Sequence, residues 1–208
     1  MSFKKNKYLV IKNAISKELA DFCYHYFLNK RAVARHLFDE KYISQFTTYF
    51  GIWNDAMVPE TYSHYGDIAM DTLLQKVKPV MEKETKIKLT ETYSYARIYK
   101  KGDELYRHKD RPSCEISTTM HLGGDEWSIF LEPSGEEGKK GIEIKLNAGD
   151  MLIYNACDLE HWREPFTGKD CAQVFLHYND SSSLEAKFNK FDGRPMLGLP
   201  GFYSSNNG

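Results

Sequence analysis

The sequence predicts a mainly β protein with a helical front (class α+β), in which N-terminal helices buttress a double-stranded β-helix, or jelly roll. Two observations favour this fold. Up to about residue 91, the apolar residues recur at helical spacing; from Thr92 onward they form short runs, many with a period of two. Eight short strands that follow helices and are separated by turns are typical of two packed antiparallel sheets.

The helical front contains two predicted helices. Ser16 can cap the first, because its side-chain oxygen can accept a hydrogen bond from the first turn. The apolar residues of this helix share one stripe: Leu19, Phe22, Cys23, Tyr26 and Phe27. The second helix is predicted from about Asp67 to Glu84, and Pro79 is expected to kink it or split it in two.

Residues 39–66, between the two helices, are irregular and rich in aromatic side chains. A loop packed over the core and a lid facing a substrate both fit this composition. The strands predicted after it are 93–100, 105–109, 115–121, 127–132, 142–146, 151–155, 160–163 and 172–178. We therefore expect a single domain over 1–208, with a helical front (about 1–91), a jelly-roll core (about 92–180) and a C-terminal tail (about 181–208).

The composition is that of a soluble globular protein. The chain has 208 residues, 41% of them hydrophobic and 27% charged, and a formal net charge of −1. This balance gives no reason to expect nucleic acid or a membrane as a partner. No apolar run approaches the roughly 20 residues that span a bilayer, and the short apolar run 8–11 is too brief for a signal peptide.

The four cysteines show no CxxC spacing, so we expect reduced thiols in a cytoplasmic protein. They are Cys23, Cys114, Cys157 and Cys171. The oligomeric state is left open.

A candidate metal site lies at His108-Lys109-Asp110, with His161 farther along the chain. Residues i and i+2 of a strand project to the same side, so His108 and Asp110 can bind one ion. Two imidazoles and one carboxylate suit one face of Fe(II) and leave the opposite face open. An HxD step alone is weak evidence. Here it gains weight because His108 and Asp110 lie at the end of the second predicted strand and His161 lies on the seventh.

Several motifs occur in an order that resembles a known family. Residues 99–110, YKKGDELYRHKD, resemble the Y-x-x-G…H-x-D segment of 2-oxoglutarate/Fe(II) dioxygenases of the prolyl 4-hydroxylase type. Residues 147–154, NAGDMLIY, resemble the turn and strand that lead to that family's distal histidine. His161 with Pro165, followed by Gly168-Lys169 and residues 175–177, resembles its distal segment and last strand. The resemblance covers roughly residues 92–180 and, more loosely, the helical front.

The resemblance implies that His108, Asp110 and His161 bind Fe(II), with 2-oxoglutarate and O2 as co-substrates and ascorbate as an optional addition. It implies hydroxylation of an unactivated C–H bond, coupled to conversion of 2-oxoglutarate to succinate and CO2. Asp110 favours hydroxylation over halogenation, because related halogenases carry a small residue at that position. The implied substrate is a prolyl or other amino-acid side chain in a peptide or protein. A free amino acid or another small metabolite also remains open.

The family holds the C5 carboxylate of 2-oxoglutarate with a lysine or arginine that follows the distal histidine. At the usual spacing this chain has the non-basic residues 170–172. Two nearby cations remain as candidates. Lys169 has the family's separation from the aromatic residue Phe175, and spacing favours it. Arg163 lies two residues beyond His161, and its guanidinium is a good partner for a carboxylate.

Three further residues are candidates for the site. The resemblance implies that Tyr99 donates a hydroxyl hydrogen bond to the co-substrate carboxylate, although a buried structural tyrosine would also fit. Arg111 either orients the substrate or forms a salt bridge. Trp53, from the aromatic segment 39–66, is a candidate substrate contact. The remaining histidines lack ligand spacing, but His177 could line the pocket.

Two other function classes compete with this interpretation. One is a non-catalytic jelly-roll protein that is structural or binds sugars, with zinc or no metal. The other is a cupin-like metalloenzyme that does not use 2-oxoglutarate, although such sites use more histidines than this sequence offers at ligand spacing. Formation of succinate from 2-oxoglutarate would distinguish an oxygenase from both.

Overall fold

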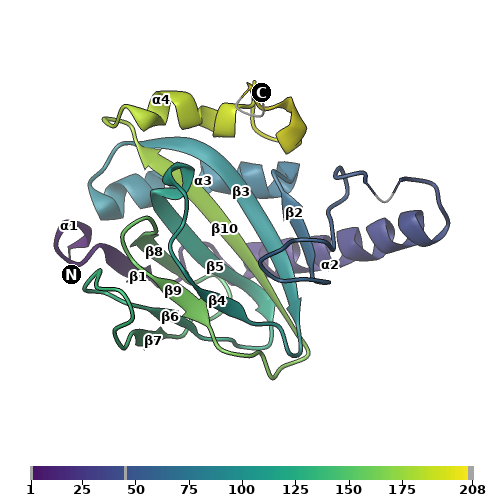
Figure 1. Ribbon diagram of the computed structural model, residues 1–208, viewed down its shortest axis with the longest axis horizontal. Helices are drawn as coiled ribbons and strands as arrows, with labels where there is room; N and C mark the ends of the chain where they lie inside the picture. Colours follow the sequence, from purple (N-terminus) through teal and green to yellow (C-terminus); the bar gives the residue numbers. More distant parts are fainter. Residues whose placement is uncertain (1, 45, 206–208) are drawn as a thin grey trace.

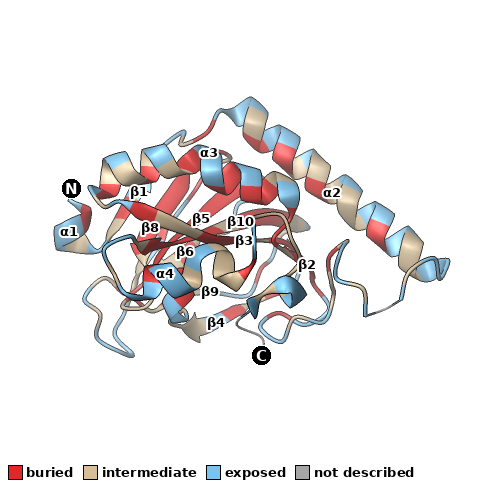
Figure 2. Cartoon of the chain, turned by 90° about the horizontal axis from the view of Figure 1, so that it is seen from above, coloured by how far each residue is buried: buried red, intermediate tan, exposed pale blue. Residues whose placement is uncertain are grey.

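The computed structural model describes residues 2–44 and 46–205. Two antiparallel sheets lie face to face, and helices α2 (Lys17–Asp39) and α3 (Ile68–Thr85) cover the outer face of the larger sheet (Figures 1 and 2). The larger sheet has the strand order β1-β8-β5-β10-β3-β2, and the smaller has the order β4-β9-β6-β7. The predicted fold class, mainly β with a helical front, is confirmed.

All eight predicted strands are present, and two more precede them. The larger sheet contains β1 (Tyr8–Ile11), β2 (Tyr62–Tyr65), β3 (Leu89–Lys100), β5 (Ile116–Gly124), β8 (Met151–Asn155) and β10 (Asp170–Asp180). The smaller contains β4 (Leu105–His108), β6 (Ile129–Leu131), β7 (Ile142–Ile144) and β9 (His161–Arg163). The strands that were not predicted, β1 and β2, are the two edges of the larger sheet.

Both long helices begin at side-chain caps. Ser16 Oγ accepts a hydrogen bond from Leu19 N–H at 3.1 Å, and Asp67 accepts one from Met70 N–H at 3.0 Å. Of the two effects expected of Pro79, a kink or a split, the split is excluded because α3 is continuous through the proline. Buried residues before and after the proline hold that face of the helix against the sheet. None of the helices among the described residues is long and apolar enough to cross a membrane.

Short helical segments complete the fold: α1 (Phe3–Asn6), α4 (Glu185–Asn189), and the 3-10 segments η1 (Pro112–Cys114), η2 (Lys190–Gly193) and η3 (Gly201–Tyr203).

The alternation of β10 separates the hydrophobic core from the interior of the jelly roll. Ala172, Val174, Leu176 and Tyr178 join the core that contains buried residues of α2 and α3. The residues of the other parity, Cys171, Gln173, Phe175 and His177, project from the opposite face of the strand. Of these, Phe175 and His177 line an internal cavity. The period of two thus assigns one face of β10 to stability and the other to a candidate site.

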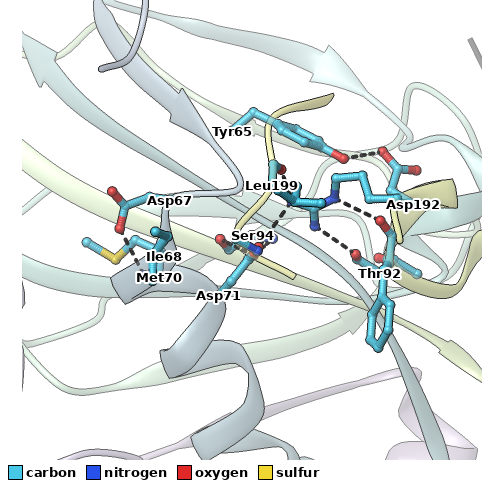
Figure 3. A network of polar contacts seen from close by, with 12 residues as sticks. Tyr65, Asp67, Ile68, Met70, Asp71, Thr92, Ser94, Asp192 and Leu199 are labelled. Carbon is cyan, nitrogen blue, oxygen red and sulfur yellow. Dashed lines mark hydrogen bonds and ion pairs between the residues drawn. The ribbon is translucent and has the colours of Figure 1, made fainter. Parts of the chain in front are cut away.

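The segment that follows β10 is anchored by a buried polar network (Figure 3). The Arg194 guanidinium pairs with the Asp71 carboxylate at 3.2 Å and donates to the carbonyl oxygens of Leu199 and Thr92. Asp71 also accepts hydrogen bonds from the backbone N–H and the hydroxyl of Ser94. The described part of the C-terminal segment is therefore attached to α3 and β3. Residues 206–208 lie outside the described residues.

Candidate metal centre and its cavity

The structure brings the three predicted metal-binding side chains together. Strand β4 ends at His108, which lies opposite His161 of β9 in the antiparallel register. The Nε2 atoms of His108 and His161 lie 3.4 and 3.6 Å from Oδ1 of Asp110. These donor atoms all lie within 4.8 Å of one another. Side chains from two strands and the residue just after one of them therefore converge at one point.

Backbone contacts set which ring nitrogen of each histidine is free. Nδ1 of His108 donates to the carbonyl oxygen of Tyr106 at 2.7 Å, and Nδ1 of His161 donates to that of Leu159 at 3.1 Å. A neutral imidazole that donates through Nδ1 keeps a lone pair on Nε2. Both lone pairs can therefore be directed at an ion, as is usual for histidine ligands.

Asp110 is held in its ionised form. Burial alone would raise its pKa, but hydrogen bonds that His108 and His161 donate when their Nε2 atoms are protonated outweigh burial and hold the pKa well below its ordinary value. A bound cation would take the place of these protons and leave both rings neutral. The Asp110 backbone N–H donates to the carbonyl of Ala156, which positions the residue after the strand has ended. Two neutral nitrogens and one carboxylate fit Fe(II) with an open face.

The three side chains lie in the wall of a cavity of about 320 Å³. The inward-facing residues of β3 and β10 line it together with the metal-site residues. The β3 and β10 residues in its wall are Tyr93, Tyr95, Arg97, Tyr99, Phe175 and His177. An ion at the three donors would therefore be accessible to a small molecule in the cavity.

Arg163 is a buried cation without a counter-ion. It is 1% exposed, and no salt bridge connects it to an acidic side chain among the described residues. Nη1 donates to the carbonyl of Trp127 at 2.5 Å and Nη2 to the Thr119 hydroxyl at 3.3 Å, while Nε has no partner. Burial lowers the pKa of the guanidinium. A buried carboxylate group would complement both the charge and the unused donors.

Tyr99 and Trp127 form a chain of contacts between the cavity and Arg163. Its buried ring lines the cavity and contacts Trp127 edge-on, and Trp127 in turn lies against the Arg163 guanidinium. The Tyr99 hydroxyl oxygen accepts a hydrogen bond from Nη1 of Arg97 at 3.2 Å. Its own proton is therefore free to be donated to a ligand.

Arg97 and Asp55 were not predicted as site residues. Nη2 of Arg97 lies 2.9 Å from Oδ2 of Asp55, and the Tyr95 hydroxyl also donates to Asp55. Both charged groups line the cavity. Arg97 shares the strand parity of Tyr99, a signal that could have identified it. Asp55 comes from the irregular segment before β2, where nothing in the sequence marks it.

Known proteins resemble this chain in structure, whereas no known sequence family matches it. Neither protein-family models nor curated sequences match the chain. Among solved structures, a prolyl-4-hydroxylase from Pseudomonas putida aligns with a TM-score of 0.64 at 9% identity, over 86% of this chain and 96% of that one. A prolyl hydroxylase from Trichoplax adhaerens, in complex with a hypoxia inducible factor peptide fragment, aligns at 0.56 and 16% identity over 86% of each chain. The chain has the fold of the 2-oxoglutarate/Fe(II) oxygenases.

The fold also occurs in oxygenases with other reactions. The carbocyclase SnoK from nogalamycin biosynthesis aligns with a TM-score of 0.58 at 10% identity, over 86% of this chain and 81% of that one. The neighbours therefore share the oxygenase fold while their reactions differ.

Within this oxygenase fold, the preference for Lys169 as the carboxylate-binding cation does not fit the observed placement. Lys169 is exposed and precedes β10, in a turn where its backbone N–H donates to Asp125. Its side chain therefore lies outside the barrel, although its spacing resembles the family pattern. Arg163, the alternative candidate, is buried inside and, unlike the buried Arg97, has no acidic partner among the described residues.

Arg111 lies in the cavity wall and forms a salt bridge. Its two terminal nitrogens lie 3.0 and 2.7 Å from the carboxylate oxygens of Asp192, and its guanidinium lies over the ring of Tyr93. The Tyr65 hydroxyl also donates to Asp192 at 2.7 Å. The C-terminal segment therefore contacts the cavity wall indirectly, because Asp192 holds Arg111, which lines the cavity.

The prediction that Trp53 contacts substrate does not fit the structure. Its ring packs between Phe38 of α2 and Tyr62 of β2, and it is absent from the cavity wall. Within the segment, Trp53 packs on the core, whereas Asp55 and Met57 line the cavity. Gln45, in the same segment, lies outside the described residues.

Proposed function

We propose that this protein is a 2-oxoglutarate- and Fe(II)-dependent oxygenase that hydroxylates an unactivated C–H bond, and that residues 1–208 form one such domain. The observation that carries the proposal is the convergence of His108, Asp110 and His161 in the wall of one cavity. The uncompensated cation Arg163, connected to that cavity through Trp127 and Tyr99, supports the choice of co-substrate.

The residues have distinct tasks in this proposal. His108, Asp110 and His161 hold Fe(II) on one face and leave the opposite face open. Arg163 binds the C5 carboxylate of 2-oxoglutarate, and the Tyr99 hydroxyl donates a hydrogen bond to the same molecule. Bound Fe(II) and 2-oxoglutarate supply the oxidising power, with O2 consumed, succinate and CO2 formed, and one oxygen atom transferred to the substrate.

The preferred substrate is a prolyl or other amino-acid side chain in a peptide or protein. The structural neighbours that support it include prolyl hydroxylases, one of them in complex with a peptide fragment. Met57 and Arg111 line the cavity and are partly exposed, so they can contact the residues that flank a target side chain.

A small molecule, such as a free amino acid, is the second candidate. Two ion pairs attach loop segments to the cavity wall: Asp55 pairs with Arg97, and Asp192 pairs with Arg111. Segments held in this way leave less room for a long peptide. The volume of about 320 Å³ suits a compact substrate, and the neighbour SnoK comes from nogalamycin biosynthesis.

The experiment that tests the proposal is anaerobic visible spectroscopy. Adding Fe(II) and then 2-oxoglutarate should produce a weak metal-to-ligand charge-transfer band that requires both additions. The band should be absent from a folded His108→Ala variant. If the wild-type protein binds iron and gives no band with 2-oxoglutarate, the proposal is wrong and a binding role or another metal chemistry takes its place.

Substrate choice is tested by succinate formation. Prolyl peptides should stimulate it above the substrate-free rate; stimulation by free amino acids in their place would favour the second candidate. Parallel reactions with and without ascorbate test whether that reductant is needed.

A further inference from the structure

A second group of metal-binding side chains adjoins the first. One donor atom each from Asp110, Cys114 and His177 lies within 4.8 Å of the other two. Cys114 and His177 are 2% and 5% exposed, and both line the same cavity as the candidate iron centre. Cys114 belongs to η1 and His177 to β10, so different elements supply the two groups.

The hydrogen bonds of Ser117 determine the tautomer of His177. The Ser117 hydroxyl donates its proton to the carbonyl oxygen of Cys114 at 2.8 Å. Its oxygen must therefore accept the hydrogen bond from Nδ1 of His177 at 2.7 Å. The lone pair of His177 is then on Nε2, which has no hydrogen-bond partner among the described residues. A buried imidazole with a free lone pair in a cavity wall is suited to binding a metal.

Asp110 can serve both groups. The histidines His108 and His161 both face its Oδ1 atom, which leaves Oδ2 as a second donor on the same carboxylate. The Cys114 sulfur lies 3.0 Å from the Tyr93 hydroxyl. When the thiol loses its proton to solvent on metal binding, that hydroxyl can donate to the sulfur and stabilise the thiolate.

We propose that Asp110, Cys114 and His177 form a second metal site that shares Asp110 with the iron centre and takes a thiophilic divalent cation such as Zn²⁺. Sulfur, imidazole nitrogen and carboxylate oxygen are the ligands that zinc prefers, and a fourth position remains for water. The thiolate distinguishes this site from the His108–Asp110–His161 group, whose nitrogen and oxygen donors suit Fe(II).

Occupancy of the second site would affect the iron centre through the shared carboxylate. A cation at Oδ2 withdraws negative charge from Asp110 and so weakens its bond to iron. The same cation takes up space in the cavity that a substrate has to enter. The site would thereby make the proposed oxygenase sensitive to zinc, although its existence does not depend on the proposed function.

Cobalt spectroscopy tests the second site without an activity measurement. Reduced, metal-free His108→Ala protein, in which the first group is disrupted, is titrated with Co²⁺. We expect a near-ultraviolet thiolate-to-cobalt charge-transfer band that saturates at one equivalent. The band should be lost when Cys114→Ser is added. It should remain when Cys157→Ser is added instead, a matched control because the Cys157 thiol contacts the backbone of Arg111, the residue after Asp110, at 3.4 Å.

His177→Gln provides an independent variant in case replacement of the buried Cys114 disturbs folding. Loss of this ligand should weaken Co²⁺ binding by at least about tenfold. Absence of the band from folded His108→Ala protein would overturn the second site, and so would a band that depends on Cys157 and not on Cys114. The Fe(II)/2-oxoglutarate band of wild-type protein is measured separately, so failure of the oxygenase proposal is distinguishable from failure of this one.

Discussion

Replacing Arg163 with methionine should separate binding of 2-oxoglutarate from stability of the fold. Methionine keeps an unbranched chain in the site and removes a buried cation that has no acidic partner among the described residues. The variant loses two hydrogen bonds, each worth about 1 kcal/mol, but it also loses the cost of burying a charge. The two effects oppose each other, so the ligand-free variant should unfold at close to the wild-type temperature.

The loss should appear when 2-oxoglutarate binds. Charge-assisted hydrogen bonds are worth about 1.5–3 kcal/mol, so the dissociation constant for 2-oxoglutarate should rise roughly 10- to 150-fold in Arg163→Met. Anaerobic titration of the charge-transfer band measures this constant, and Lys169→Met is the matched control that should leave it unchanged. If Arg163→Met binds normally and Lys169→Met does not, the reasoning from burial is refuted and the preference from spacing is restored.

Three further predictions concern groups around the site. Asp71→Asn leaves the buried Arg194 cation without its charged partner and should lower the free energy of unfolding by about 3–5 kcal/mol in urea denaturation; a loss under 1 kcal/mol would contradict it. Burial and a neighbouring cation lower the pKa of His121 to about 4, below its unfolded value near 6.5. The unfolded chain therefore binds the proton first, and stability should fall as the pH drops from about 6.5 to 4, by up to roughly 3 kcal/mol for this group. Thermal unfolding across this range should show a shallower fall in His121→Gln, and an identical slope would exclude the group as a cause. Asp55→Asn weakens the ion pair with Arg97, so amides of residues 53–58 should exchange hydrogen faster by mass spectrometry, whereas unchanged exchange would show that this ion pair does not hold the segment.

The strands of the jelly roll were predictable because they form short runs separated by turns, and successive side chains point to opposite faces. In β10, for example, residues of one parity enter the helix-covered core and those of the other project from the opposite face. Strands β1 and β2 were missed because they lie outside the run of strands that begins near residue 92, β1 before the first helix and β2 after an irregular segment. The sequence left open whether α3 continues through Pro79, because continuity depends on packing against the sheet.

The convergence of the metal site was predictable from the HxD step and the order of the strands. What sequence could not supply was the exposure of individual cations, since spacing alone favoured Lys169 over Arg163. The pairing of Arg97 with Asp55, and of Arg111 with Asp192, joins residues far apart in the chain. Such contacts depend on how loops cross the sheet, which local patterns do not encode.

Within three consecutive residues, the C-terminal segment makes two different contacts, one with the core and one with a residue of the cavity wall. Arg194 is buried and attaches the segment to the core, whereas Asp192 forms an ion pair with Arg111 at the cavity. A substitution at Asp192 can therefore change how Arg111, which lines the cavity, is held, while the anchor at Arg194 stays unchanged. Laboratory libraries that aim to reposition Arg111 in the cavity wall can therefore vary Asp192 without altering the anchor at Arg194.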